Sequence, residues 1–229
     1  MTLVWVPGLI IFVLFLSATP DHSSVKPREV KKDNVNWVDF EHKITSSFSD
    51  SQKVDYNLIK SYIKDRYRKI KDQDITQISA YLVKFGNEMG IDPKITAALV
   101  ARESSFNKEA VSVTGAKGLG QIKDFNFKAL DISNPFDIKE NIKGTTQYLT
   151  FLMDKWKKKN QKETQVSANN GLKVLSESEK LKLSLASYFK GFTNVVKSQG
   201  TPDLKTTGYV NDILKYYEEL KLKSQKAVK

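Results

Sequence analysis

Residues 92–104 read DPKITAALVARES, and this stretch decides the fold class of the chain. The Asp-Pro pair at its start is a typical helix opening, because aspartate caps free backbone N–H groups and proline suits the first helical position. Ile95, Leu99 and Glu103 then recur every four residues, so they share one side of the helix. The stretch therefore predicts a helix whose apolar stripe ends in a carboxylate.

The position of Glu103 predicts an unusual acid. Burial disfavours the charged form of a carboxyl group, and the negative end of the helix dipole acts in the same direction, so both raise the pKa. A glutamate that stays protonated near neutral pH can act as a general acid. From spacing alone, an alternative stays open: the stripe ends at this position, and Glu103 is solvated or pairs with Lys94 or Lys108.

Apolar residues on either side of this helix also recur at helical spacing, and no alternating strand pattern of useful length is present. Asp137 and Glu140 form a capping-box pattern before one of these segments. The fold class is predicted to be all-α. The helical stripes are Tyr56, Ile59, Tyr62 and Ile63; Ile75, Ile78, Leu82 and Phe85; Ile142, Leu149, Leu152 and Trp156; Leu181, Leu183, Leu185 and Ala186; and Val210, Ile213, Leu214, Tyr217 and Leu220.

The composition excludes several kinds of chemistry. The chain has no cysteine, so disulfides, thiolate nucleophiles and cysteine-ligated metals are excluded. Its two histidines, His22 and His42, lie near the N-terminus, so a histidine-dependent site formed entirely by later residues is impossible. No metal or cofactor is expected. A hydrophobic content of 40% with 28% charged residues is typical of a globular chain.

The net charge of +11 is compatible with a polyanionic partner but does not identify one. Nucleic-acid readers rely on arginine for bidentate contacts, whereas only four of the 37 basic residues here are arginines. No nucleic-acid partner is therefore expected. Association with an anionic wall polymer or membrane surface stays open.

Residues 3–18 read LVWVPGLIIFVLFLSA and carry no charge. The run is shorter than the about 20 residues of a membrane-spanning helix and fits the hydrophobic region of a secretory signal. Signal peptides normally carry a basic residue before this region, and none is present, so an uncleaved N-terminal anchor is the alternative. Both interpretations predict an exported, periplasmic or envelope-associated protein.

The chain is accordingly divided into three parts. Residues 1–20 are interpreted as the signal peptide or anchor, and the polar residues 21–52 as a linker or arm on which Trp37 and Phe40 could dock onto the body. Residues 53–229 are predicted to form one compact helical domain.

A glycine-rich turn follows the helix that carries Glu103. Residues 115–122 read GAKGLGQI, in which three glycines within six residues imply a tight backbone turn that presents Gln121. The Gly-Lys-Ser/Thr of a phosphate-binding loop is absent. A glutamate at a helix end beside a turn that displays an amide suits a polysaccharide cleft.

Together these segments resemble the catalytic domain of soluble-type (Slt) lytic transglycosylases, within the lysozyme-like superfamily. The resemblance covers about residues 75–218 and rests on five pieces in the family's order. They are GIDP with ALVARESSFN at 90–107, AVS with GAKGLGQI at 110–122, NPFD with NIKG and YL at 134–149, LASY at 185–188 and GYV at 208–210.

The resemblance implies roles for five residues. Glu103 matches the family's single catalytic acid and base. Ser112 and Gln121 are expected to line the cleft near the acetamido sugar, Tyr188 to lie near Glu103, and Tyr209 to flank the same cleft.

Two positions depart from the family pattern. Gly120 stands where the family usually has methionine, which is expected to remove an apolar cleft wall and add flexibility. Phe189 follows the motif tyrosine where the family usually has asparagine, so an amide that could bind sugar or backbone is lost.

The reaction that the resemblance implies is non-hydrolytic cleavage of the bond between N-acetylmuramic acid and N-acetylglucosamine in peptidoglycan strands, which leaves a 1,6-anhydromuramyl end. Two alternatives stay open. One is a hydrolytic lysozyme with a second acid such as Asp137, Glu140 or Asp154, and the other is a non-catalytic wall-binding relative of the same fold.

Overall fold

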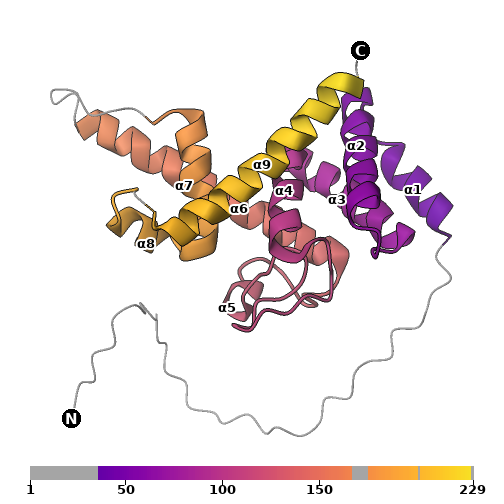
Figure 1. Cartoon of the computed structure of the whole chain (residues 1–229), viewed down its shortest axis with the longest axis horizontal. Coiled ribbons are helices and arrows are strands. Elements are labelled where there is room, and N and C mark those ends of the chain that lie inside the picture. The colour runs from indigo at the N-terminus through magenta and orange to yellow at the C-terminus, as the bar shows by residue number, and fades with distance from the viewer. Residues whose placement is uncertain (1–35, 167–174, 201, 228–229) are drawn as a thin grey trace, which may run out of the picture. The chain divides into compact units, whose positions relative to one another are not determined.

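The computed structural model describes residues 36–166, 175–200 and 202–227 (Figure 1). Within these residues all regular elements are helices, and the only β-type pairings are isolated bridges within residues 111–122. The predicted all-α class is therefore confirmed. The helices are α1 (Trp37–Thr45), α2 (Asp50–Arg66), α3 (Asp72–Glu88), α4 (Pro93–Ser104), α5 (Asp124–Phe127), α6 (Ile138–Val166), α7 (Glu177–Lys190), α8 (Phe192–Lys197) and α9 (Leu204–Ala227).

The hydrophobic run predicted as a leader lies outside the described residues. Helix α1 falls within the range 21–52 for which an arm is expected, and it packs against α3. Phe40 contacts Tyr81 with ring centroids 6.0 Å apart, in line with the docking expected for this side chain. Among the described residues, no helix combines the length and apolar character needed to cross a membrane.

Helix α4 lies at the centre of the helical body, beside α9 (Figure 1). It is apolar on all sides, and residues 95–101 are all buried, which is the pattern of a helix enclosed by its neighbours. Its two sides belong to two hydrophobic clusters, one formed mainly with α2 and α3 and the other with α6, α7 and α9. Helix α4 contributes Ala97, Val100 and Ala101 to the first cluster, and Ile95, Ala98 and Leu99 to the second.

Both ends of α4 are fixed by local interactions. The Asp92 carboxylate accepts a hydrogen bond from the Lys94 backbone N–H at 2.9 Å, as the sequence predicts for a helix cap. At the other end Ser105 and Phe106 adopt left-handed backbone angles, with φ of 51° and 61°. The Phe106 side chain is buried and contacts the Tyr67 ring at 5.0 Å between centroids. The last turn of α4, which carries Glu103, is thus held in place.

The start of α6 is capped differently from the predicted capping box. Asp137 accepts a hydrogen bond from the Glu140 backbone N–H at 2.9 Å, which confirms the cap itself. The Glu140 carboxylate does not return this bond. It instead accepts the N–H groups of Ser133 at 2.7 Å and Asn134 at 2.8 Å. The reciprocal half of the box is therefore wrong, because the preceding loop offers two N–H groups to the same carboxylate.

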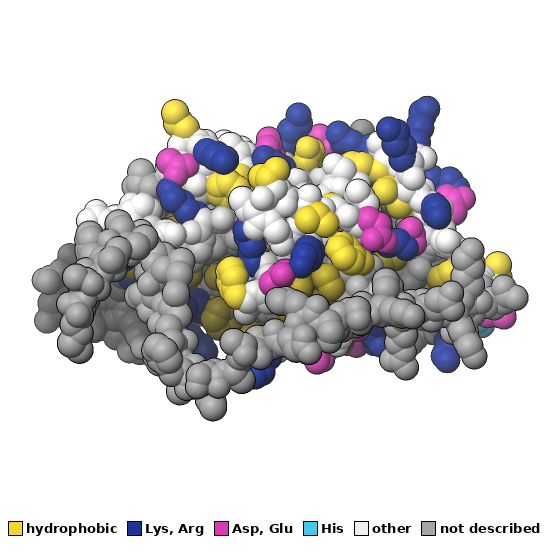
Figure 2. Space-filling model, turned by 90° about the horizontal axis from the view of Figure 1, so that it is seen from below, with side chains coloured by type: hydrophobic (Ala, Val, Ile, Leu, Met, Phe, Trp, Pro, Cys, Tyr) yellow, Lys and Arg dark blue, Asp and Glu magenta, His cyan; other side chains and the backbone are white. Residues whose placement is uncertain are grey.

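The excess positive charge is spread over the surface. On the face shown in Figure 2, lysine and arginine side chains are interspersed with acidic and hydrophobic ones. Several lysines are paired with carboxylates, including Lys60 with Glu41 at 2.6 Å and Lys117 with Asp124 at 2.8 Å. On this face the basic side chains therefore do not gather into one stripe.

Candidate active site

Glu103 lies in the last turn of α4 and lines a pocket of about 390 Å³. The other walls come from loop residues 112–126, from Tyr148 of α6, and from Tyr188 and Phe189 of α7. Segments far apart in the sequence therefore meet at one carboxylate. Among the described residues that line this pocket, Glu103 is the only acid.

The two lysines considered as partners of Glu103 are engaged elsewhere. Lys94 binds Asp55 at 2.7 Å, and Lys108 binds Asp74 at 2.9 Å. Glu103 is therefore not paired with either ammonium group, and the simple ion-pair interpretation of its position is wrong.

The electrostatic environment of Glu103 agrees with the predicted acid. Burial raises the pKa of its carboxyl group to about 7, against the opposing influence of a hydrogen bond from Tyr209 and the positive charge of Arg102. The carboxyl group is thus close to half protonated at neutral pH. Such a group can donate a proton in one step and accept one in the next.

Tyr209 of α9 contacts Glu103 but does not line the pocket. Its side chain is buried, and its hydroxyl donates a hydrogen bond to Oε1 of Glu103. Tyr209 is not among the residues that line the pocket. Burial and the nearby charge of Glu103 raise the pKa of the Tyr209 hydroxyl well above its ordinary value, so it stays a donor. The structure therefore brings Tyr209 into contact with the glutamate without making it part of the pocket lining.

Tyr188 of α7 lines the pocket, as the sequence predicts. Its hydroxyl donates to the backbone carbonyl of Gly120 at 2.8 Å, and its ring packs against Tyr148 with centroids 5.1 Å apart. Burial, followed by the charge of Glu103, raises the pKa of the Tyr188 hydroxyl well above its ordinary value. Tyr188 thus connects the glycine-rich loop to the wall beside Glu103.

The glycine-rich loop is held by the side chain of Asn141 on α6. Asn141 Oδ1 accepts the Gly120 N–H at 2.8 Å, while Nδ2 donates to the carbonyls of Pro135 at 2.7 Å and Lys117 at 3.3 Å. Gly118 has a φ of 75°, and a Cβ there would lie 2.2 Å from Asn141 Nδ2. Glycine is therefore required at this point for both the backbone angle and the close approach.

Ser112 and Gln121 both line the pocket, as expected from the sequence. Each also stabilises the loop. Ser112 Oγ accepts the Ala116 N–H at 3.0 Å, and Gln121 Nε2 donates to the carbonyls of Ala110 at 3.1 Å and Gly118 at 3.0 Å. The amide N–H groups of Gln121 are thus engaged inside the loop, so its carbonyl oxygen is the group suited to accept a bond from a ligand.

The space beside Gly120 is filled by the neighbouring helix. A Cβ at Gly120 would lie 1.9 Å from Oγ1 of Thr145 on α6. The Gly120 N–H is bound by Asn141 and its carbonyl by Tyr188. The structure differs from the expected loss of a cleft wall, because Thr145 fills the space beside Gly120. It also differs from the expected gain in flexibility, because the N–H and the carbonyl of Gly120 are both hydrogen-bonded.

Phe189, the second departure, replaces the expected polar group with an aromatic cover. Its ring stacks on the Tyr209 ring with centroids 4.6 Å apart and planes inclined by 22°. The side chain lines the pocket and stays 41% exposed.

Sequence reasoning missed three features of this site. Asn141 lies in a matched segment, but nothing local indicates that its amide holds the glycine-rich loop. Tyr148 was assigned only to that segment, yet it packs against Tyr188 at the pocket wall. Phe125 of α5 also lines the pocket and is 81% exposed, and a single phenylalanine in a polar loop gives no signal that would distinguish it from a core residue.

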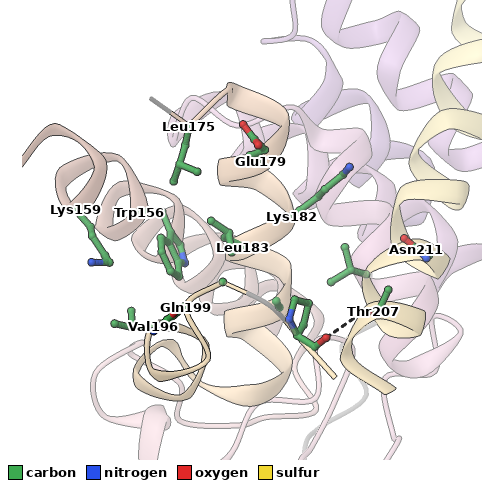
Figure 3. A pocket seen from close by; sticks show the side chains of 14 residues that line it. Trp156, Lys159, Leu175, Glu179, Lys182, Leu183, Val196, Gln199, Thr207 and Asn211 are labelled. Carbon is green, nitrogen blue, oxygen red and sulfur yellow. Dashed lines mark hydrogen bonds between the residues drawn. The ribbon is translucent and has the colours of Figure 1, made fainter. Parts of the chain in front are cut away.

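A larger pocket of about 700 Å³ lies among α6, α7, α8 and α9, away from Glu103 (Figure 3). Trp156, Leu183 and Val196 give it an apolar lining. Its one acidic side chain, Glu179, accepts the Ser176 N–H at 2.9 Å and so caps α7. The Glu179 carboxylate therefore stabilises the start of α7. Of these two pockets, only the smaller one has among its described lining residues an acid, Glu103, that binds a tyrosine hydroxyl and no ammonium group.

Metal ligation has no evident basis in the described part of the chain. Within those residues no group of three or more histidine, aspartate or glutamate side chains lies close enough together to hold an ion.

Two comparisons with known proteins indicate the same family. A family model described as "Transglycosylase SLT domain" matches residues 80–207. Similar curated proteins include the membrane-bound lytic murein transglycosylase F of Pectobacterium atrosepticum, which is 26% identical over 139 residues, and that of Salmonella arizonae, which is 25% identical over 139 residues. Both matches cover 58% of this chain, but only 25% and 24% of the respective relatives. The chain thus spans about a quarter of the length of the curated relatives it matches.

The family match covers more than half of the chain and includes the residues that build the pocket. Glu103, Ser112, Gln121 and Tyr188 all lie within it, and Tyr209 lies two residues after its end. The chain belongs to the transglycosylase SLT domain family.

Proposed function

We propose that this protein is a peptidoglycan lytic transglycosylase that cleaves the bond between N-acetylmuramic acid and N-acetylglucosamine without using water. Membership of the SLT domain family supports this reaction class, as do the names of the similar curated proteins. The single observation that carries the proposal is Glu103, a carboxyl group with a pKa raised to about 7 in a pocket that no second described acid lines.

The first step uses Glu103 in its protonated form. Its proton passes to the glycosidic oxygen while the bond from that oxygen to C1 of the muramyl sugar breaks, so the N-acetylglucosamine side leaves as an alcohol. The acetamido group of the same muramyl sugar stabilises the positive charge that develops at C1. A pKa near neutrality makes the proton available at working pH.

The second step uses Glu103 as a carboxylate. It takes the proton of the muramyl C6 hydroxyl while that oxygen forms a bond to C1, which closes the 1,6-anhydro ring and regenerates the acid. The hydrogen bond from Tyr209 and the charge of Arg102 both favour the carboxylate that exists between the two steps.

A hydrolytic mechanism has less support from the geometry. Inverting and most retaining glycosidases place two carboxylates around the scissile bond. Asp137 caps the start of α6, the Glu140 carboxylate binds two N–H groups of the loop before it, and Asp154 is exposed on the same helix. None of the three lines the pocket of Glu103. A scheme in which the substrate supplies the second nucleophile accounts for a single acid.

The polar groups around Glu103 are proposed to hold the sugar. Gln121 and Ser112 line the pocket, and the carbonyl oxygen of the first and the hydroxyl of the second suit the N–H and hydroxyl groups of an acetamido sugar. Tyr188 fixes the loop beside them, and Tyr209 orients the carboxyl group from behind.

The place of action is proposed to be the cell envelope. The uncharged run at residues 3–18 suits export or anchoring, and the similar curated proteins are named as membrane-bound. Peptidoglycan strands are the proposed partner. The net charge of +11 favours association with an anionic wall or membrane surface.

The proposal is tested with the variant Glu103→Gln on purified murein sacculi. Glutamine keeps the size of the side chain but can neither donate nor take up the proton, so turnover is expected to fall by at least about 10³-fold. Glu109→Gln, an exposed glutamate in the loop after α4, is the matched control and is expected to keep wild-type turnover. Sacculi that are solubilised equally well by Glu103→Gln and wild type would refute the assignment.

A further inference from the structure

Phe189 occupies an unusual position for a large apolar side chain. It is 41% exposed and lines the Glu103 pocket, whereas phenylalanine side chains are most often buried in the core. Its ring is not free. It stacks on the Tyr209 ring with centroids 4.6 Å apart and an interplanar angle of 22°, which is the tightest ring contact among the described residues.

Tyr209 transmits this contact to Glu103. Its side chain is only 3% exposed, and its hydroxyl donates to Oε1 of Glu103. Phe189 lines the pocket whereas Tyr209 does not, and the Phe189 ring covers one face of the Tyr209 ring. Hydrogen bonds to a charged group strengthen when water is kept away from them.

We propose that Phe189 is a positioning residue that acts through Tyr209: its ring covers the Tyr209 ring at the pocket edge and excludes water from the Tyr209–Glu103 hydrogen bond. The consequence for catalysis rests on the function proposed above, whereas the consequence for the Glu103 carboxyl group does not. The family's usual asparagine would admit water at this point, so the exchange to phenylalanine gives this chain a drier acid.

The charged and titratable groups around Glu103 define what else could affect its proton. Arg102 lies next to it on α4, contacts the Tyr209 ring at 5.4 Å and binds Asp212 of α9 at 2.8 Å. Tyr188 approaches from α7. The ammonium groups that line the pocket belong to Lys123, which binds the Thr114 carbonyl at 2.7 Å, and Lys190, which pairs with Asp203.

A near-identical phenylalanine elsewhere provides the control. Phe151 of α6 is 52% exposed and stacks on Tyr148 with an interplanar angle of 18°, although its centroid distance of 6.5 Å is longer than the 4.6 Å between Phe189 and Tyr209. A lysine ammonium lies over each ring, Lys155 over Phe151 at 5.3 Å and Lys205 over Phe189 at 5.7 Å. Phe151, however, does not line the Glu103 pocket, and its ring partner Tyr148 packs against Tyr188 rather than donating a hydrogen bond to Glu103 as Tyr209 does.

The direct test measures the titration midpoint of Glu103 by NMR in the full chain labelled at glutamate. The side-chain carboxyl carbon is followed as pH changes, and its signal is assigned by its loss in Glu103→Gln. Phe189→Ala admits water to the carboxyl group. Burial is the largest cause of the raised Glu103 pKa and outweighs the Tyr209 hydrogen bond, so the titration midpoint is expected to move down by about one pH unit, a tenfold change in proton affinity. Phe189→Asn is expected to do the same. Phe189→Tyr and Phe151→Ala are expected to leave the midpoint at its wild-type value.

The outcomes separate the inference from the proposed function. A midpoint that is unchanged or higher in both Phe189→Ala and Phe189→Asn overturns the inference, whether or not the protein turns over murein. In the kinetic version, the loss of activity toward high pH is expected to begin about one pH unit lower in Phe189→Ala, with rescue by Phe189→Tyr. A raised KM with an unchanged pH profile would instead make Phe189 a sugar contact and would also overturn it.

Discussion

Two glutamates of this protein receive a hydrogen bond from a tyrosine, yet their proton affinities differ in opposite directions. Glu41 of α1 accepts from Tyr56 at 2.7 Å and from the Lys60 ammonium at 2.6 Å. Glu103 of α4 accepts from Tyr209 but binds no ammonium group.

The balance between burial and positive charge decides the difference. At Glu41, burial raises the pKa, but the bonds from Lys60 and Tyr56 and the charge of Lys60 outweigh it, so the pKa lies below its ordinary value. At Glu103, burial dominates and the pKa reaches about 7. A tyrosine partner alone therefore does not make a glutamate an acid catalyst. Burial without an ammonium group bound to the carboxylate is what distinguishes Glu103.

The largest difference between the two glutamates is expected when the tyrosine partner of each is exchanged for phenylalanine in turn, with the effect confined to Tyr209→Phe. Tyr209→Phe removes the donor that stabilises the Glu103 carboxylate between the two proton transfers, and turnover is expected to fall about 30-fold, as for the loss of one charge-assisted hydrogen bond. The Glu103 pKa rises further in this variant, so the fall in activity with pH shifts to higher pH. Steady-state rates between pH 4 and pH 9, roughly the range around the ordinary and raised values, measure both.

Tyr56→Phe is the matched control for this exchange. It removes the corresponding hydroxyl beside Glu41, far from the pocket, and is expected to leave turnover and its pH profile unchanged. Equal losses of activity in the two variants would mean that the hydroxyls act on folding rather than on the glutamates.

A smaller effect is expected in the pH dependence of stability. Because the folded-state pKa of Glu103 is raised from 4.5 to about 7, its contribution to stability is complete below pH 4.5 and is lost as pH rises through 7. Wild type is expected to lose about 1–2 kcal/mol relative to Glu103→Gln between pH 5 and pH 8, about the range of this titration. Urea unfolding at the two pH values measures the difference.

Glu41→Gln gives the opposite and smallest effect. Its lowered folded-state pKa contributes stability at neutral pH, which is lost as pH falls through that value. Since the side chain of Glu41 is 35% exposed, the loss at pH 7 is expected to stay below about 1 kcal/mol. A gain in stability of Glu41→Gln at pH 7, of the kind expected for Glu103→Gln at pH 8, would reverse the comparison.

Much of the fold follows from local pattern. The stripe of Ile95 and Leu99 places Glu103 at the buried end of α4, and the apolar periodicities locate α2, α3, α6, α7 and α9. Helices α1, α5 and α8 were not predicted, since they are short and gain their order from packing rather than from periodicity. The Asp137 cap was correct, but the destination of the Glu140 carboxylate depended on the loop before it.

The site was predictable in its members more than in its arrangement. Glu103, Ser112, Gln121 and Tyr188 do meet at one pocket. The position of Tyr209 behind the glutamate depends on how α9 crosses α4, which no single segment encodes. The fit of Gly120 against Thr145 likewise depends on the distance between a loop and a helix that are adjacent only in the folded chain.

The central claim is that Glu103 alone serves as acid and then as base, and the released muropeptides test it most directly. Mass spectrometry of the fragments that wild-type protein releases from purified sacculi is predicted to show 1,6-anhydromuramyl ends, and these are predicted to be absent with Glu103→Gln. Fragments with reducing ends would show that water attacks C1, would require a second acid that the pocket does not contain among its described residues, and would contradict the account.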